Sequence, residues 1–394
     1  MKRRILKAAA AALSAVVLLC GCDQGTGVKG TGAEILKYDV EPYELPQNEG
    51  MEFVKNLKIG WNLGNTLEAS VKTAKTTNSE TTWGNPLTTQ EMIDMVRKAG
   101  FNTVRIPVTW SNHLEEDSFT VKQAWMDRVK EVVDYAYNSG MFVIINIHHD
   151  IDPKYYYPSY ECLDSTKEFS NAIWKQICET FKDYDEHLIF ESINEPRQKG
   201  TANEWWLDLN SDLAKEAIDC IMQTNQEFVN TVRASGGNNG TRWLMTPSYA
   251  ANYQYTACDL FNLPDDPENR TMVSIHAYEP YDFALSDKMN ASVFDKDVTG
   301  GTLILMFDQI YEKFTSKGIP VVMGEFGCRN KDNLEARIVH SGYYVALARS
   351  VGISCLWWDN NAFEGDGELF GLLDRDNLAW YFPDIVLSLM KNCE

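Results

Sequence analysis

The sequence lacks several patterns that mark metal, nucleotide or multi-module proteins. It has no CxxC pair and no cysteine–histidine run with metal-ligand spacing, so a structural zinc site is not expected. No glycine-rich phosphate loop follows the first predicted strand, which argues against a doubly wound nucleotide-binding fold. No internal repeat and no linker rich in proline, threonine and serine occurs after residue 50. These absences favour a single large domain.

The number of cysteines after residue 22 is odd, so they cannot all pair in disulfides. With Cys20 and Cys22 set aside, seven of the nine cysteines remain. An exported protein could form one or two disulfides from them, but the spacing does not select the partners.

Positive charge is scarce. The chain has 36 lysines and arginines against 56 aspartates and glutamates, and its net charge is −20. Removal of residues 1–21, which carry four basic residues and no acidic one, takes the net charge to −24. Nucleic acids and anionic membrane surfaces are poor partners for such a field. The binding of a neutral polysaccharide would not be affected by this negative charge.

The only long apolar run is at the N-terminus and is too short to span a bilayer. It follows a basic start and ends in Leu-Cys-Gly-Cys22, which resembles a bacterial lipobox with Cys22 as the site of lipid attachment. We therefore expect a lipoprotein signal at 1–21, a tether and lead-in at 22–50, and export to the cell envelope. The membrane would be contacted only through the lipid. The alternative is an ordinary signal peptide and a secreted protein.

Short apolar runs alternate with amphipathic stretches over residues 51–394, which predicts a (β/α)8 TIM barrel. The expected strands are 57–63, 103–108, 141–147, 188–193, 243–246, 272–275, 320–323 and 354–358. The expected helices are 88–99, 122–138, 166–182, 203–234, 303–316, 334–350 and 377–392. An open sheet could share this alternation, but polar residue types recur at all eight strand ends, as a barrel mouth requires.

Two glutamates stand just after predicted buried strands. Glu195 ends His-Leu-Ile-Phe-Glu-Ser-Ile-Asn-Glu, and Glu325 follows Pro-Val-Val-Met-Gly. Two carboxyl groups facing each other across a barrel mouth can cleave a glycosidic bond. We expect Glu195 to act as general acid and then base, and Glu325 as nucleophile. The alternatives are a helix cap or surface position for Glu195 and a loop position for Glu325.

Other polar residues at strand ends are expected to support these carboxylates. Arg105, within the second predicted strand, would lie below Glu325 and keep it ionised; the alternative is a structural ion pair. His148 and His149 end the third strand. Adjacent strand residues point to opposite sides, so a metal ion shared by the two histidines is not expected.

Asn194, next to Glu195, can hold the sugar 2-hydroxyl. His276 and Tyr278 alternate at the sixth strand end, and the tyrosine could donate its hydroxyl to the nucleophile or simply pack on its neighbours. One of Trp357 and its neighbour Trp358 should offer a flat face to a sugar ring while the other lies in the core.

Seven motifs taken together resemble the retaining glycoside hydrolases of family 5, and most of all the endo-β-1,4-glucanases of subfamily 4. They are GWNLGNT at 60–66, NTVRIP at 102–107, IHH at 147–149, INEP at 193–196, IHAY at 275–278, GEFG at 324–327 and WWDN at 357–360. They occur in barrel order across 51–394. The resemblance implies a TIM barrel with Glu195 as acid/base and Glu325 as nucleophile. It also implies a supporting set of Arg105, His148, Asn194, His276, Tyr278 and Trp357, to which we add His149, Asn65 and Trp83 as candidate substrate contacts.

The expected activity is endo-hydrolysis of β-1,4-glucan with net retention, by a monomer that needs no metal and no cofactor. A xyloglucanase, a mixed-linkage glucanase (licheninase) and a β-mannanase share this catalytic frame and stay open as alternatives. Two rivals from other classes are a glycan-binding protein and a metal-dependent barrel hydrolase that uses His148 and His149. No carbohydrate-binding module is visible.

Overall fold

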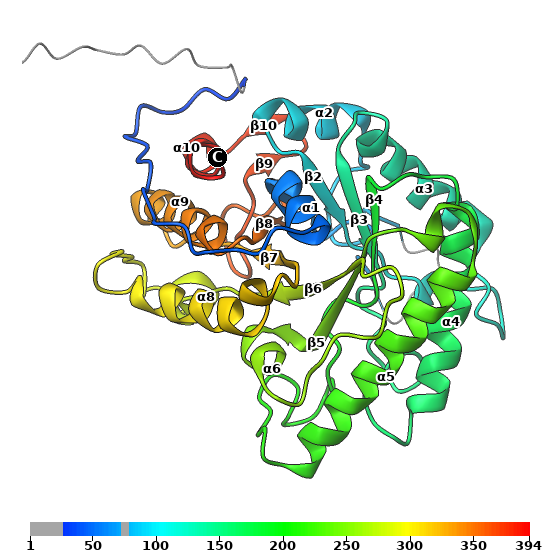
Figure 1. The fold of residues 1–394 in the computed structure, drawn as a ribbon. Coiled ribbons are helices and arrows are strands. Elements are labelled where there is room, and N and C mark those ends of the chain that lie inside the picture. The colour runs from blue at the N-terminus through cyan, green and yellow to red at the C-terminus, as the bar shows by residue number, and fades with distance from the viewer. Residues whose placement is uncertain (1–26, 72–78) are drawn as a thin grey trace, which may run out of the picture.

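The computed structural model describes residues 27–71 and 79–394. Eight parallel strands form a closed barrel in chain order, which confirms the predicted (β/α)8 fold (Figure 1). The strands are β1 (Ile59–Leu63), β2 (Thr103–Ile106), β3 (Phe142–Asn146), β4 (Leu188–Glu191), β5 (Leu244–Asn252), β6 (Thr271–His276), β7 (Val321–Phe326) and β8 (Ser354–Asp359).

Amphipathic helices surround the barrel and bury their apolar faces on the outside of the strands. The long ones are α2 (Gln90–Ala99), α3 (Gln123–Tyr137), α4 (Leu163–Thr180), α5 (Asp212–Ala234), α8 (Gly301–Lys313), α9 (Leu334–Ser350) and α10 (Pro383–Asn392). Shorter elements are α6 (Tyr253–Ala257), α7 (Tyr281–Ala284), η1 (Ser111–His113), η2 (Gly237–Gly240), η3 (Thr315–Lys317) and an antiparallel pair, β9 (Leu373–Asp374) and β10 (Ala379–Trp380).

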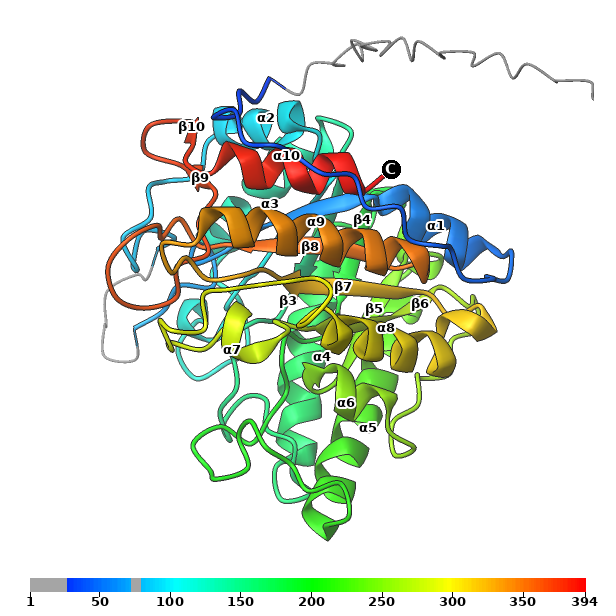
Figure 2. The ribbon, with the colours of Figure 1, turned by 90° about the vertical axis from the view of Figure 1, so that its left-hand side faces the viewer.

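A helix that the sequence analysis did not predict, α1 (Glu49–Leu57), closes one end of the barrel. Its N-terminus is capped by the side chain of Asn48, which accepts a hydrogen bond from the Met51 amide at 2.9 Å. Phe53 and its neighbours on the inner face pack into the barrel against the apolar inward side chains of the strands. Figure 2 shows α1 at one end of the barrel and the β9–β10 pair at the opposite end. The polar strand ends therefore lie above a sealed apolar floor.

Two predicted helices start six or more residues later than expected. The helix expected over 203–234 begins at Asp212, because Ser211 caps it by accepting from the Ala214 amide. Residues 203–211 form a loop instead, and this loop carries two exposed tryptophans, Trp205 and Trp206. The helix expected over 377–392 begins at Pro383, which fits the preference of proline for the first helical turn.

The described chain before α1 forms no helix or strand and packs on the outer helices. The Thr31 amide donates to Asp384 at 3.0 Å, the Tyr38 amide to Asn392 at 2.8 Å, and the Tyr43 amide to the Ser350 carbonyl at 2.9 Å. The predicted signal, Cys22 and the first part of the tether lie outside the described residues. Within 27–71 and 79–394, no helix has both the length and the apolar composition needed to cross a membrane.

Candidate active site

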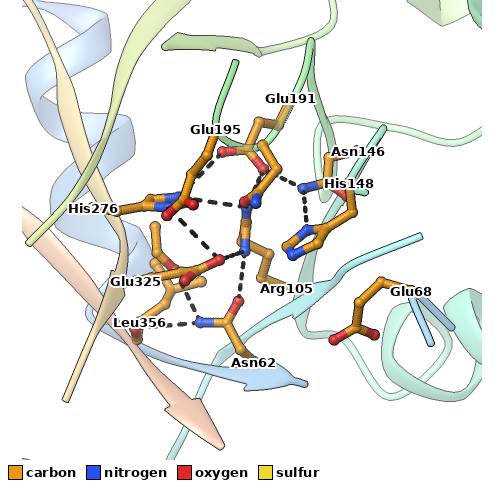
Figure 3. A network of polar contacts seen from close by, with 12 residues as sticks. Asn62, Glu68, Arg105, Asn146, His148, Glu191, Glu195, His276, Glu325 and Leu356 are labelled. Atoms are coloured by element: carbon orange, nitrogen blue, oxygen red, sulfur yellow. Dashed lines mark hydrogen bonds and ion pairs between the residues drawn. The ribbon is translucent and has the colours of Figure 1, made fainter. Parts of the chain in front are cut away.

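A buried arginine is the centre of the polar layer inside the barrel mouth. Arg105 on β2 has no exposed surface, and its guanidinium donates to four acceptors that come from β1, from β7 and from the end of β4. Nε donates to Glu191 at 2.8 Å and Nη1 to Glu325 at 2.7 Å. Nη1 also donates to Asn62 at 3.0 Å, and Nη2 to Asn194 at 2.7 Å. Figure 3 shows Arg105 between the carboxylates of Glu191 and Glu325.

Glu325, on β7, is held by two donors, one for each carboxylate oxygen. Arg105 donates to Oε1, and the Tyr278 hydroxyl donates to Oε2 at 2.9 Å. Burial and the charge of Glu325 raise the pKa of Tyr278 well above its usual value, so the phenol keeps the proton that it donates. A Cβ on Gly324, the residue before Glu325, would lie 3.0 Å from His276 Nε2, so a larger residue there would press on the His276 ring.

Glu195, just beyond β4, is hydrogen-bonded to the last residue of β6. Its Oε1 lies 2.9 Å from His276 Nδ1. Burial acts to raise the pKa of Glu195, but the hydrogen bond and charge of His276 and the charge of Arg197 outweigh it and lower that pKa. Burial acts to lower the pKa of His276, but the carboxylates of Glu325 and Glu195 raise it above its usual value. Together these two shifts favour a pair that holds one proton between Glu195 and His276.

The two candidate catalytic carboxylates lie close together. One oxygen of Glu195, one nitrogen of His276 and one oxygen of Glu325 all lie within 4.8 Å of one another. In the described part of the chain, this is the only grouping of three such residues with metal-like spacing. We assign no metal to it, since the guanidinium of Arg105 already balances Glu325 and the imidazole of His276 already meets Glu195.

The two histidines after β3 take different positions. His148 is buried, and its Nδ1 lies 3.1 Å from the Asn146 side-chain nitrogen. Burial, with the nearby His149 and Arg105, lowers the pKa of His148 well below its usual value. His149 is half-buried, and burial with the charge of Arg197 lowers its pKa to about 4. Both rings are therefore neutral hydrogen-bonding groups at neutral pH.

The expectation that Trp357 stacks on the substrate does not fit its position. Trp357 has no exposed surface; it packs edge-on against Phe326 in the layer between strands and helices. Trp358 points the other way, into the mouth, because it pairs in register with the inward-facing Asn62. Its ring lies parallel to that of His148 at 5.9 Å and is 6% exposed. Trp358 is thus the residue of the pair that can meet a sugar.

The remaining candidates lie on the rim. Trp83 is 41% exposed, its ring centre lies 5.6 Å from that of His149, and its indole N–H donates to the Ser70 carbonyl at 3.0 Å. Asn65 is half-buried with a positive φ of 57°, and its carbonyl accepts from the Asn85 side chain at 2.8 Å. Trp83 can therefore offer a ring to a ligand, whereas the hydrogen bond from Asn85 to the Asn65 carbonyl orders the loop that carries Asn65.

The sequence analysis missed a fully buried acid beneath the site. Glu191, the last residue of β4, accepts from Arg105, from Asn146 at 2.9 Å and from the Ser274 hydroxyl at 2.5 Å. A glutamate inside the apolar run Leu-Ile-Phe-Glu-Ser-Ile was the available signal. Because a buried carboxylate needs a partner, it should have been paired with Arg105, the only arginine within a predicted strand.

We expect Glu191→Gln to destabilise the protein by about 3 kcal/mol, because it removes one charge from a buried, fully bonded ion pair. The measurement is the free energy of unfolding from urea denaturation. The control is Glu49→Gln, which breaks a surface pair with Arg270 in which the Glu49 side chain is 63% exposed. That change should cost less than about 1 kcal/mol. Equal losses in the two variants would contradict a structural role for Glu191.

Known proteins resemble this chain in both sequence and structure. The profile of the cellulase family, glycosyl hydrolase family 5, matches residues 67–364. Endoglucanase 1 of Ruminococcus albus is 45% identical over 346 residues, which cover 87% of this chain and 81% of that protein. A solved family 5 lichenase from Caldicellulosiruptor sp. F32 is 47% identical with a TM-score of 0.89, covering 92% of this chain and 100% of that one.

The subfamily resemblance is also confirmed. A GH5-4 broad specificity endoglucanase from Ruminococcus champanellensis, solved with bound cellotriose, has a TM-score of 0.82 and 42% identity and covers 88% of this chain and 100% of that one. The family match spans most of the barrel, and the ordered motifs form one polar cluster at its mouth. This chain therefore belongs to glycosyl hydrolase family 5.

Proposed function

We propose that this protein is a retaining endo-β-1,4-glucanase with Glu325 as nucleophile and Glu195 as acid/base. The observation that carries the proposal is the approach of a Glu195 oxygen to within 4.8 Å of a Glu325 oxygen. Retaining glycosidases separate their carboxyl groups by about 5 to 5.5 Å, whereas inverting enzymes need roughly 6.5 to 9.5 Å to admit a water molecule. The short separation favours retention.

In the first step, Glu325 attacks the anomeric carbon while Glu195 gives a proton to the departing glycosidic oxygen. Arg105 and Tyr278 hold Glu325 and fix the direction of its oxygens. The proton comes from the Glu195–His276 pair. Because the Asn194 oxygen accepts from Arg105, its amide nitrogen is the end left to bind a sugar hydroxyl.

In the second step, Glu195 removes a proton from water, and that water cleaves the bond between the sugar and Glu325. The sugar leaves with its original anomeric configuration, and both carboxylates return to their starting states. Every proton moves between groups of this chain, the sugar and water, so the scheme uses no metal and no cofactor.

The substrate class is supported by the named relatives, which include endoglucanases and a lichenase. Trp358 in the mouth and Trp83 on the rim offer aromatic rings of the kind on which sugar rings stack. Cellulose-type and mixed-linkage β-glucans are therefore the proposed substrates. Xyloglucan and mannan are the alternatives, because they need the same carboxylates and differ in the contacts of the flanking rings.

The test is hydrolysis of carboxymethylcellulose, barley β-glucan, xyloglucan and glucomannan, with proton NMR of the first product formed. We expect the highest rates on the first two substrates, a fast fall in chain length, and a newly formed β-anomer. An initial α-anomer would refute retention. A preference of ten-fold or more for xyloglucan or glucomannan would move the substrate assignment to the corresponding alternative.

We also infer that the enzyme is exported and lipid-anchored through Cys22 and that it acts as a monomer. The anchoring rests on the basic, apolar and Leu-Cys-Gly-Cys sequence at the N-terminus. The described chain begins to pack against the barrel core at Val28, which leaves a short glycine-rich stretch between Cys22 and the folded body.

A further inference from the structure

Arg197, two residues after the proposed acid/base, contacts that residue at two points. Its Nη1 donates to the Glu195 backbone carbonyl at 2.9 Å and lies 3.6 Å from Oε2 of the Glu195 carboxylate. The other oxygen, Oε1, is the one that meets His276. The two oxygens of Glu195 therefore face two different basic side chains, His276 and Arg197, and the scheme above gives no role to Arg197.

Arg197 is itself held in place by two neighbours from the loop before α5. Its Nε donates to Oε1 of Glu204 at 3.3 Å, and the other oxygen of Glu204 accepts from the Gly200 amide at 2.9 Å. The ring of Trp205 lies over the guanidinium, with 4.0 Å between Cζ and the ring centre. The Arg197 side chain is only 8% exposed as a result. The cation is thus desolvated and oriented on the side of Glu195 away from His276.

We propose that Arg197 is a positioning residue for the acid/base Glu195 and that Glu204 sets how strongly Arg197 acts on it. The inference rests on the proposed function, since it takes Glu195 to be the group that transfers the proton. The retaining mechanism needs that carboxyl to hold a proton in one step and to accept one in the next. Because Arg197 is shared between Glu195 and Glu204, it stabilises the carboxylate form of Glu195 by less than it would if Glu204 were absent.

Other charged and titratable groups also face Glu195, and their effects must be separated from that of Arg197. Those from the ends of β3 and β6, from β7 and from the loop after β8 are His149, His276, Tyr278, Glu325 and Glu368. The sixth is Arg105 on β2, which donates to Glu325 and lies 3.5 Å from His276. His276 contributes more than Arg197 to lowering the pKa of Glu195. None of these six residues contacts Glu204. A substitution of Glu204 therefore changes the pKa of Glu195 in two ways, through Arg197 and through the loss of the Glu204 charge itself.

The two residues should act in opposite directions. Arg197→Gln removes a cation near Glu195, so the pKa of the Glu195–His276 pair should rise. Glu204→Gln removes the anion that shares Arg197, so the same pKa should fall. The basic limb of the pH profile of kcat/KM reports loss of the catalytic proton from the free enzyme. We expect that limb to move up by about one pH unit in Arg197→Gln and down by about half a unit in Glu204→Gln.

The experiment measures kcat/KM for cellotetraose, a neutral substrate, across the pH range for the wild type and each variant. Arg197→Lys is the conservative variant: it should return the basic limb to the wild-type position but keep a reduced kcat/KM, because one ammonium cannot reproduce the fork that reaches both the carbonyl and Glu204. The matched control is Arg270→Gln, which removes one positive charge just before β6, where Arg270 forms a surface pair with Glu49 of α1. It should leave the profile unchanged.

A merely structural role would lower activity or stability without opposite shifts. The proposal would be overturned if the basic limb of the kcat/KM profile stayed in place in both variants. It would also be overturned if the limb moved in the same direction in Arg197→Gln and Glu204→Gln. The Glu204 side chain is 22% exposed, so its variant should fold even if the arginine variant does not, and its downward shift is decisive alone. Failure of the proposed function would appear differently, as full activity in a Glu325 variant.

Discussion

Replacing Glu325 with glutamine should reduce turnover of β-glucan by on the order of 10⁵-fold, because the nucleophile is lost. Glutamine has nearly the shape of glutamate, and its amide oxygen can still accept from Arg105 or Tyr278. Arg105 keeps its other carboxylate partner, Glu191, at 2.8 Å. The buried layer therefore retains a charge pair, and we expect the variant to fold with only a modest loss of stability.

The informative measurement is trapping of the covalent intermediate. A 2-deoxy-2-fluoro-β-cellobioside with a good leaving group should add one 2-deoxy-2-fluorocellobiosyl mass to the wild type, located on the peptide that contains Glu325, and none to the variant. Glu335→Gln, at an exposed position in the first turn of α9, is the control from the same βα unit and should behave as wild type. Label on another carboxylate, or turnover within ten-fold of wild type, would end the assignment.

The barrel could be predicted because burial on both faces makes each strand a short apolar run, and amphipathic helices separate the runs. Every observed barrel strand overlaps its predicted range, and α9 matches it at both ends. The plug helix α1 was missed because it directly precedes β1: Leu57 ends the helix and Ile59 begins the strand. An apolar stretch that joins two elements does not reveal where one ends.

Within the site, the sequence predicted which residues lie at the ends of strands. It did not predict which side chains of a strand point into the barrel and which point outward. Glu195, Glu325 and Arg105 were expected at one mouth, and the structure brings them together. Trp357 was chosen over Trp358 without knowing which side of β8 faces inward. That phase is set by pairing with Asn62, a long-range contact. Arg197 was missed because its role depends on a loop, 203–211, that sequence periodicity assigned to a helix.

Replacing Glu195 with alanine should have an effect that depends on the leaving group of the substrate. On cellotetraose the departing sugar needs a proton, so we expect a loss of about 10² to 10⁴-fold. A dinitrophenyl β-cellobioside has a leaving group that needs no proton, so its first step should proceed. The second step then lacks a base, and the glycosyl-enzyme on Glu325 should accumulate as a burst followed by slow turnover.

Azide should restore turnover of the dinitrophenyl substrate in this variant, since it attacks the intermediate without giving up a proton and can occupy the space left by the side chain. The product should be a β-glycosyl azide, because attack on the intermediate inverts the configuration that its formation had inverted. The loop should keep its place, as Arg197 bonds to the backbone carbonyl at position 195, which alanine retains. Equal losses on both substrates with no response to azide would mean that position 195 does not transfer the proton. Because Glu325→Gln cannot form the intermediate, the same azide treatment of that variant should yield no β-azide, and this contrast separates the two carboxylates by role.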